Sequence, residues 1–348
     1  MNITKHTIKI TESLKNALIK LDNNPKYLTL FVVDDNNIIK GTLTDGDIRR
    51  GLIKGLSIND KLEKFIYKDF KYLTENEYNF SKIKEFREKK LKVVPLINKK
   101  GKIIKLYNFN EIKSILPIDA VIMAGGKGER LRPLTEKTPK PLLKIGDKEI
   151  IAYNFDRLYQ FGINNQHITV NYLAEQIENF CKNYNNKINF KIYKEKEFYG
   201  TAGSLSLIKN FSNDTILLMN SDLLTNIDYE DFYKTFINKK LDMLVASISY
   251  DVDLPYAIFN HDNNNNIKSL KEKPRFTYYA NAGIYLFKKE LLNIIPKNKI
   301  YNATDFIEDI ISKNKKIRHY TIRGYWLDIG KHNDLKKAQT DINHINWD

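Results

Sequence analysis

One pattern of apolar and polar positions occurs twice in residues 11–113. Leu14, Leu18 and Leu21 have helical spacing and predict a helix over residues 11–21. The segments that follow are predicted as a strand at 28–33, a turn at 34–37, a strand at 38–43 and a helix beginning near Thr44. The second copy is predicted as a helix at 80–89, strands at 93–97 and 102–107 and a helix-like segment at 108–113. Neither copy could bury its apolar face alone, so we expect the two to pack together.

A different pattern begins after Pro117, where short apolar strands alternate with amphipathic helices. The predicted strands are 119–123, 167–171, 189–193, 215–219, 243–250 and 282–287. The predicted helices are 151–160, 174–182, 203–208 and 229–236. This alternation is typical of an α/β fold with a mostly parallel sheet covered on both faces. Pro117 cannot continue a helix, so we expect two domains, a small α+β domain at 1–116 and a larger one at 117–348.

Composition and charge narrow the class of protein. An apolar fraction of 42% with 21 Tyr and 18 Phe indicates a globular protein. The net charge of +15 comes mostly from scattered lysines, whereas a nucleic-acid-binding protein usually gathers its basic residues on one element. We therefore expect a solvated basic surface and no nucleic-acid partner, and an anionic small ligand is the alternative.

The chain also lacks the usual signs of secretion or membrane insertion. The single cysteine, Cys181, excludes a disulfide within one chain and is expected in a helix core. No segment approaches the roughly 18 apolar residues that cross a bilayer, and residues 1–10 do not resemble a signal peptide. We expect a cytoplasmic protein with no membrane partner.

The strongest chemical signal follows the first strand of the larger domain. Three glycines, Gly125, Gly126 and Gly128, allow the backbone to approach a triphosphate and aim N–H groups at its oxygens. Arg130 and Lys140 follow and provide cations for phosphate oxygens. The spacing is neither that of a Walker A loop nor that of a dinucleotide fingerprint. A tight turn with surface cations is the structural alternative.

This passage resembles the signature of the sugar-1-phosphate nucleotidyltransferases, a family with a Rossmann-like core, and the likeness continues from Ile118 to the C-terminus. The resemblance implies that the glycine loop holds the nucleotide, with Arg130 and Lys140 acting on the phosphates near the reacting centre. The implied nucleotide-binding residues are Met123, Ala124, Gly125, Gly126, Gly128, Glu197, Gly200 and Thr201. The last three belong to a segment that lies beside the base in this family.

Two aspartates are candidates for binding Mg²⁺. Asp222 follows the apolar run 216–219 and is therefore expected at the carboxyl end of a strand, although it could instead cap a helix. Asp328, in the segment Trp326-Leu327-Asp328-Ile329-Gly330, matches the family segment that supplies the second carboxylate. Two carboxylates together with substrate phosphates suit Mg²⁺. No group of Cys and His competes for the metal.

The resemblance also implies a sugar site. Glu272 is expected to accept hydrogen bonds from sugar hydroxyls, and Lys273 to pair with the sugar phosphate as a catalytic cation, while Asn281 and Gly283 line the same pocket. Ordinary exposed charge is the alternative for Glu272 and Lys273. At 256–258 the chain has Tyr-Ala-Ile where many relatives have Tyr-Gly-Val, so we expect Ala257 to alter the sugar pocket.

The repeated pattern of the smaller domain resembles a pair of CBS modules, which sense adenosyl ligands. The matching residues are Thr44 and Asp47, which contact a ribose in that family. They could equally form the N-cap of a helix. The second copy lacks the aspartate, so we expect one ligand site or none. The pair is expected to regulate or to dimerise the protein, which favours a homodimer.

Together these features predict a Mg²⁺-dependent enzyme that joins an NTP to a sugar 1-phosphate and releases pyrophosphate. The combination with a CBS pair resembles the D-glucosamine-1-phosphate guanylyltransferases of bacterial legionaminic acid biosynthesis, which implies GTP and glucosamine 1-phosphate. Mannose-1-phosphate guanylyltransferases are the next alternative. A non-catalytic nucleotide sensor is the alternative of another class.

Overall fold

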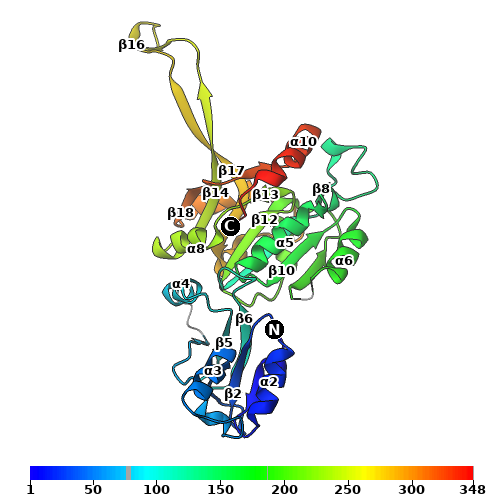
Figure 1. Ribbon diagram of the computed structural model, residues 1–348. Helices are drawn as coiled ribbons and strands as arrows, with labels where there is room; N and C mark the ends of the chain where they lie inside the picture. The colour runs from blue at the N-terminus through cyan, green and yellow to red at the C-terminus, as the bar shows by residue number, and fades with distance from the viewer. Residues whose placement is uncertain (76–79, 186, 348) are drawn as a thin grey trace. The chain divides into compact units, whose positions relative to one another are not determined.

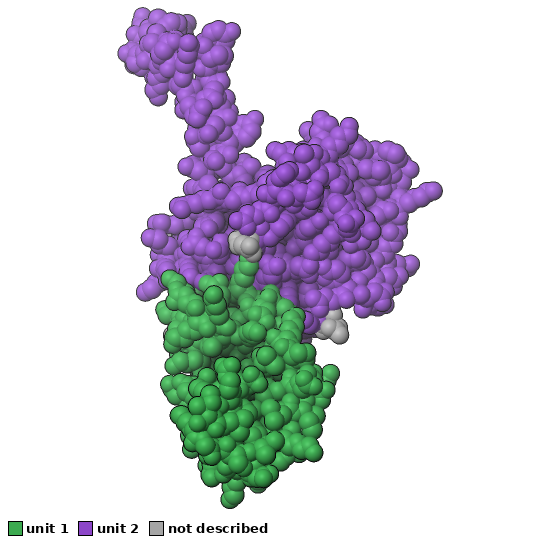
Figure 2. Space-filling model, viewed as in Figure 1, with its two compact units in different colours: residues 1–115 green, residues 116–348 purple. Residues whose placement is uncertain are grey.

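A computed structural model describes residues 1–75, 80–185 and 187–347. The chain forms two compact units, Met1–Ile115 (unit 1) and Leu116–Asp348 (unit 2), which are coloured separately in Figure 2. In the described part of the chain, every helix is too short or too polar to cross a membrane.

Unit 1 contains two three-stranded sheets with the same order of pairing. The first sheet is β1 (Thr7–Lys9), β2 (Thr29–Val33) and β3 (Ile39–Thr44), and the second is β4 (Leu73–Thr74), β5 (Val93–Ile97) and β6 (Ile103–Asn108). In each sheet the first pair of strands is parallel and the second pair is antiparallel. The helices are α1 (Ile3–His6), α2 (Leu14–Asp22), α3 (Asp45–Ile53), α4 (Phe80–Glu88) and the 3₁₀ turn η1 (Leu62–Lys64).

The two copies share a core, as the repeat predicts. Phe31, Val33 and Ile39 of the first copy pack in one apolar cluster with Val93 and Ile97 of the second. The predicted helix-like segment at 108–113 is wrong, because turns replace it. Asn108 Oδ1 accepts a hydrogen bond from Asn110 N at 3.1 Å, a local bond that competes with a helix.

Unit 2 is built on a seven-stranded sheet of order β11-β10-β7-β12-β17-β14-β18 (Figure 1). The strands are β7 (Ile118–Ala124), β10 (Asn165–Val170), β11 (Asn189–Lys194), β12 (Thr215–Asn220), β14 (Met243–Asp253), β17 (Arg275–Lys288) and β18 (Ile317–Thr321). β11, β10, β7 and β12 are mutually parallel, and β17 runs antiparallel to its neighbours β12 and β14. The prediction of a mostly parallel sheet is therefore confirmed.

Helices cover both faces of this sheet. The helices are α5 (Ile150–Gln160), α6 (Ala174–Asn183), α7 (Gly200–Gly203), α8 (Tyr229–Asn238), α9 (Ala303–Ser312) and α10 (His332–Asp341). On one face, Phe306 and Ile310 of α9 join the cluster of β12, β14 and β17. On the other face, Gln166 of β10 donates to the Phe155 carbonyl of α5 at 3.1 Å. Cys181 is buried in α6, as predicted, and burial raises the pKa of its thiol to about 12.

Short pairs of strands and 3₁₀ turns complete unit 2. The pairs are β8 (Lys144–Ile145) with β9 (Lys148–Glu149), β13 (Leu223–Thr225) with β19 (Trp326–Asp328), and β15 (Ile258–His261) with β16 (Ile267–Lys271). The turns are η2 (Glu129–Leu131), η3 (Lys140–Leu142), η4 (Ser204–Leu207), η5 (Lys289–Ile294) and η6 (Ile342–His344). β14 and β17 stay paired beyond the sheet and carry β15 and β16 outward as an arm, residues 249–280 (Figure 1).

Candidate active site

The glycine loop lies directly after the central strand β7. Gly128 has a left-handed φ of 63°, and a Cβ there would lie 3.0 Å from the Lys140 Cβ. The Thr135 hydroxyl donates to the Gly128 carbonyl at 2.8 Å and holds the loop in place. Glycine is required at this position because an L side chain would be strained and would clash. The turn η2 then presents Arg130.

Two aspartates are brought together by the pairing of β13 with β19. Asp222 immediately precedes β13, and Leu223 is the register partner of Asp328. Ile329 N donates to the Asp222 carbonyl at 3.1 Å, which extends the ladder to the site. Residues distant in sequence thus become neighbours through these short strands.

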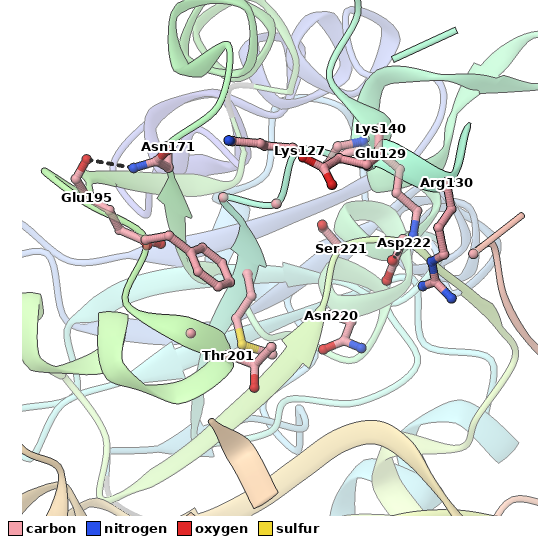
Figure 3. Close-up of a pocket in the computed structure, with 18 residues that line it drawn as sticks. Lys127, Glu129, Arg130, Lys140, Asn171, Glu195, Thr201, Asn220, Ser221 and Asp222 are labelled. Atoms are coloured by element: carbon pink, nitrogen blue, oxygen red, sulfur yellow. Dashed lines mark hydrogen bonds and ion pairs between the residues drawn. The ribbon is translucent and has the colours of Figure 1, made fainter. Parts of the chain in front are cut away.

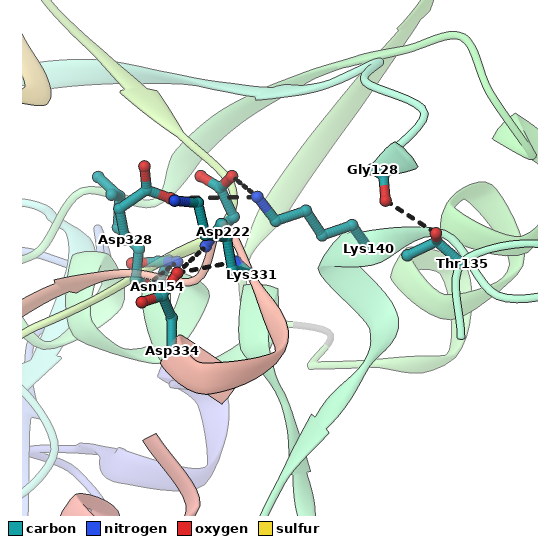
Figure 4. A network of polar contacts seen from close by, with 10 residues as sticks. Gly128, Thr135, Lys140, Asn154, Asp222, Asp328, Lys331 and Asp334 are labelled. Atoms are coloured by element: carbon teal, nitrogen blue, oxygen red, sulfur yellow. Dashed lines mark hydrogen bonds and ion pairs between the residues drawn. The ribbon is translucent and has the colours of Figure 1, made fainter. Parts of the chain in front are cut away.

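Lys140 reaches toward both carboxylates, as Figure 4 shows. Its Nζ donates to Asp222 Oδ2 and lies 4.0 Å from Asp328 Oδ1. Lys140 is only 9% exposed, so its charge is screened little by solvent. The ammonium therefore partly balances two acids that would otherwise repel each other.

The surroundings of Asp328 disfavour the ionised form of its carboxyl. Burial, followed by the nearby Asp222, raises the pKa of the Asp328 carboxyl above its usual value, while Lys140 and Arg130 act in the opposite direction. In the part of the chain that the structure describes, Asp222 Oδ1 and Asp328 Oδ1 are buried and accept no hydrogen bond. Two buried carboxylate oxygens lacking donors are suited to a divalent cation.

The donor set agrees with Mg²⁺ rather than with a metal enclosed by protein ligands. Among the described residues, no group of three or more His, Cys, Asp or Glu could hold a metal ion. Mg²⁺ typically takes one or two carboxylates and completes its shell with water and substrate phosphates. Asp222 and Asp328 fit that requirement.

A pocket of about 590 Å³ joins this acidic centre to the glycine loop (Figure 3). The predicted residues that line it are Met123, Gly125, Gly126, Gly128, Arg130, Lys140, Gly200, Thr201 and Asp222. Ala124 is not among them and is buried in β7. Asp328 does not line the pocket either, but it contacts Lys140, which does.

The acid at the far end of the pocket is Glu195, not the predicted Glu197. Glu197 is exposed and does not line the pocket, whereas Glu195 is 5% exposed and does. The reason is that β11 ends at Lys194, and Glu195 N donates to the Val170 carbonyl of β10 at 2.8 Å. The carboxyl end of the strand thus places Glu195 at the pocket.

Sequence reasoning also missed polar residues that follow neighbouring strands. Asn171 follows β10, and Asn220 and Ser221 lie at the end of β12, where all three line the pocket. The carboxyl ends of parallel strands meet at one edge of a sheet, where ligands bind. That rule, applied to each predicted strand, could have found them.

The segment containing Gly200 is fixed against the start of α9. Gly200 has a φ of 78°, and a Cβ there would lie 2.7 Å from the Tyr301 carbonyl oxygen. Thr201 Oγ1 accepts a hydrogen bond from Ala303 N at 2.8 Å. Both residues line the pocket from this rigid position.

The structure divides the predicted sugar residues into two groups. Gly283 adjoins the pocket, because a Cβ there would lie 2.6 Å from Nδ2 of Asn220. Asn281 lies beside it and accepts a hydrogen bond from Gly283 N at 2.9 Å. Both residues lie on β17, and of the two Gly283 adjoins a residue of the pocket wall, Asn220.

Glu272 and Lys273 are placed elsewhere, which corrects the sequence prediction. Both follow β16 in the arm, are exposed and do not line the pocket. The cause is the continuous register of β14 with β17, in which Asp253 pairs with Arg275 and carries the intervening segment away. Ala257 lies in the same arm and does not line the pocket.

In unit 1, Thr44 and Asp47 form the helix cap that was the alternative interpretation. Thr44 N donates to Asp47 Oδ2 at 2.9 Å and Asp47 N donates to Thr44 Oγ1 at 3.2 Å, a complete capping box. The same two residues line a pocket of about 390 Å³ together with Arg50, Lys71 and Lys89. Capping and ligand contact are therefore compatible at this position.

The fold and the site define a class, an α/β protein with a glycine loop and a paired-carboxylate centre, and comparison with known proteins names the family. The family described as nucleotidyl transferase matches residues 119–344, and the CBS domain family matches residues 2–54. The chain belongs to the nucleotidyl transferase family. The CBS match covers the first of the two copies in unit 1.

Individual relatives agree with this assignment. The bifunctional protein GlmU of Methanocaldococcus jannaschii is 32% identical over 228 residues, 64% of this chain and 53% of the relative. The mannose-1-phosphate guanylyltransferase catalytic subunit beta of Drosophila melanogaster is 29% identical over 223 residues, 62% of this chain and 60% of the relative. The chain therefore spans little more than half the length of these relatives.

A solved structure from Bacillus anthracis, assigned as a glucose-1-phosphate thymidylyltransferase and complexed with sucrose, also resembles this chain. The likeness has a TM-score of 0.53 and 26% identity, and covers 66% of this chain and 97% of the other. It supports the fold of unit 2.

Proposed function

We propose that unit 2 transfers a nucleotidyl group from GTP to a sugar 1-phosphate, with glucosamine 1-phosphate as the first candidate, and releases pyrophosphate. The observation that carries the proposal is the contact of Lys140 with both Asp222 and Asp328, beside a glycine loop that lines one pocket with Lys140 and Asp222. A nucleotidyl transferase family match and relatives named as guanylyltransferases support it.

The residues of the pocket have separate tasks in this reaction. Backbone N–H groups of the glycine loop hold the triphosphate, and Arg130 and Lys140 offset charge as it develops on the α-phosphate. A sugar-phosphate oxygen attacks the α-phosphorus in line, and pyrophosphate leaves on the opposite side. No enzyme nucleophile is needed, so positioning and charge stabilisation account for the rate.

Asp222 and Asp328 would hold the Mg²⁺. A bound Mg²⁺ supplies Lewis-acid stabilisation of phosphate charge. Lys140, which contacts Asp222 in the ligand-free protein, is then in a position to turn toward the phosphates. Asn281 and Gly283 line the sugar end in this proposal, and Glu272 and Lys273 take no part in it.

Mannose 1-phosphate is the second candidate substrate, because several relatives are named for that activity. The test incubates the full chain with Mg²⁺, each NTP in turn, and glucosamine 1-phosphate, mannose 1-phosphate or glucose 1-phosphate, and measures pyrophosphate. Release with GTP and glucosamine 1-phosphate is the expected result. Release with mannose 1-phosphate alone favours the second candidate, and no release from any pair rejects the proposal.

For the whole protein we propose a cytoplasmic homodimer that contributes to nucleotide-sugar supply for legionaminic acid synthesis. Unit 1 would regulate the enzyme or dimerise it, with an adenosyl nucleotide in the pocket of Thr44 and Asp47. Titrating AMP and ATP into the protein tests the ligand. Light scattering with and without those nucleotides tests the dimer, and a monomer under all conditions would contradict it.

A further inference from the structure

The strand that follows Asp222 belongs to a short pair of strands. β13 and β19 have three residues each, and their register aligns Leu223 with Asp328. An isolated pair of strands has little stability of its own in water. The position of Asp222 relative to Asp328 therefore depends on what else holds β13.

Helix α5 holds the backbone of β13 through two buried polar side chains. Asn154 Nδ2 donates to the Leu223 carbonyl at 2.9 Å, and Figure 4 draws Asn154 in the same polar network as both aspartates. One helical turn further along α5, Arg157 Nη2 donates to the carbonyls of Asn226 at 2.9 Å and Ile227 at 3.1 Å. Asn154 is 2% exposed and Arg157 5% exposed. One helix thus fixes both the start of β13 and the residues that follow it.

The second terminal nitrogen of Arg157 binds residues 342–347, which we call the strap. Arg157 Nη1 donates to the Trp347 carbonyl at 2.6 Å. The Trp347 ring stacks on Tyr153 of α5, with ring centroids 5.6 Å apart and an interplanar angle of 16°. The planar guanidinium has several N–H donors in a fixed arrangement, so one side chain joins α5, the strap and the end of β13.

The strap also contacts residues that flank both aspartates. Its apolar side chains pack against a buried cluster that contains Leu224 of β13 and Ile329, the residue after Asp328. The Asn346 carbonyl accepts a hydrogen bond from Asn226 Nδ2 at 2.8 Å. The strap therefore packs against the neighbours of both carboxylates.

We infer that Arg157 is a positioning residue that, together with the strap, fixes β13 and so sets Asp222 against Asp328. Two carboxylates at one site repel each other, so their backbones must be held together. Arg157 does not line the pocket, and it acts through β13 rather than on a substrate. The consequence for catalysis rests on the proposed function, whereas the hold on β13 can be measured without metal or substrate.

Hydrogen exchange followed by mass spectrometry measures that hold directly. Arg157→Met removes the guanidinium, and Trp347→Ala removes the ring that stacks on Tyr153. We expect the backbone amides of β13 and β19 to exchange at least about 10-fold faster in Arg157→Met, because a hydrogen bond from a charged group is worth about that factor or more. Trp347→Ala should cause a smaller increase, and Trp347→Phe, which keeps a ring for Tyr153, should keep the wild-type rates. The amides of the buried strand β7 should change less than those of β13 in every variant.

The effect on the metal centre is measured as the Mg²⁺ concentration that gives half-maximal pyrophosphate release. Residues that hold a metal ligand in place typically contribute 10- to 100-fold to metal affinity, so we expect this concentration to rise about 10-fold in Arg157→Met. Saturating Mg²⁺ should restore most of the turnover, and the KM for GTP under that condition should stay unchanged.

Ile310→Ala is the matched control for a general loss of stability. Ile310 is buried in the cluster of α9, β12, β14 and β17, whose described members include no residue of β13, β19 or the strap. The cavity left by the substitution should lower the Tm. The Mg²⁺ requirement should stay at the wild-type value, and β13 should exchange no faster relative to β7 than in the wild type.

Three results would overturn the inference. One is unchanged exchange of β13 in the folded variants, and another is faster exchange with an unchanged Mg²⁺ requirement. The third is an equal rise in the Mg²⁺ requirement of Ile310→Ala, which would assign Arg157 a general stabilising role. If Arg157→Met does not fold, Trp347→Ala and Trp347→Phe give the same comparison. If the wild type releases no pyrophosphate from any pair of substrates, the proposed function fails, and exchange of β13 alone decides whether Arg157 positions Asp222.

Discussion

Gly126→Ala should change nucleotide affinity and stability in opposite directions. An ideal Cβ on Gly126 has no heavy atom within 4 Å, and the residue has no left-handed φ. The substitution therefore adds no strain and restricts the unfolded chain, which stabilises a protein by about 0.4–1 kcal/mol. For a unit of this size, the Tm of unit 2 should rise by roughly 1–4 °C.

The same methyl group would stand in the pocket where phosphate oxygens approach the loop. Losing one backbone hydrogen bond to a charged phosphate costs about 1.5–3 kcal/mol, so GTP affinity should fall about 10- to 100-fold. Calorimetry gives the affinity, and thermal unfolding without ligand gives the Tm. Wild-type affinity in a stably folded Gly126→Ala protein would refute the assignment of this loop to the triphosphate.

Gly200→Ala is the contrasting variant. A Cβ there combines a left-handed φ with a 2.7 Å approach to the rigid Tyr301 carbonyl. Left-handed strain of about 1–2 kcal/mol and overpacking of about 1–3 kcal/mol should together lower stability by roughly 2–5 kcal/mol. A Tm equal to that of the wild type would show that this segment is not fixed against α9.

The remaining predictions concern the two aspartates. Asp222→Asn should lower turnover at least about 100-fold by weakening the hold on Mg²⁺, with an unchanged circular dichroism spectrum, and near-normal turnover would contradict the metal assignment. Because the pKa of Asp328 is raised in the folded protein, its charge lowers stability as pH rises above the carboxyl's ordinary value. Asp328→Asn should therefore raise the Tm in EDTA at pH 7, with a gain that shrinks toward pH 4, and a constant difference would contradict this. Added Mg²⁺ should raise the Tm of the wild type more than that of Asp328→Asn, and equal shifts would exclude Asp328 as a ligand.

Much of the sheet and the position of the glycine loop could be predicted from the sequence. β7, β10 and β12 are buried strands of a parallel sheet, and their nearly continuous apolar runs identify them. The glycine loop has few other physical explanations, since three glycines in four positions serve a close backbone approach. Asp222 followed from its place after an apolar run.

The parts that were missed depend on tertiary geometry. Glu195 and Glu197 are two residues apart and carry the same charge, and only the end of β11 decides which one faces the pocket. The arm was missed because β14 and β17 extend past the sheet. Most residues in these outer parts are exposed, so no alternation of buried and exposed positions marks them as strands. Helix α9 was also missed, although the sequence carries a signal for its start, the capping box of Asn302 with Asp305.

The central claim is most directly tested by counting products. Purified full-length protein with Mg²⁺, GTP and glucosamine 1-phosphate should release one pyrophosphate for each nucleoside diphosphate-sugar detected by mass spectrometry. Neither product should form when the sugar phosphate is omitted, and Asp222→Asn should form both at a rate lower by at least about 100-fold. Hydrolysis of GTP without a sugar-linked product, or equal product formation by Asp222→Asn, would contradict the account.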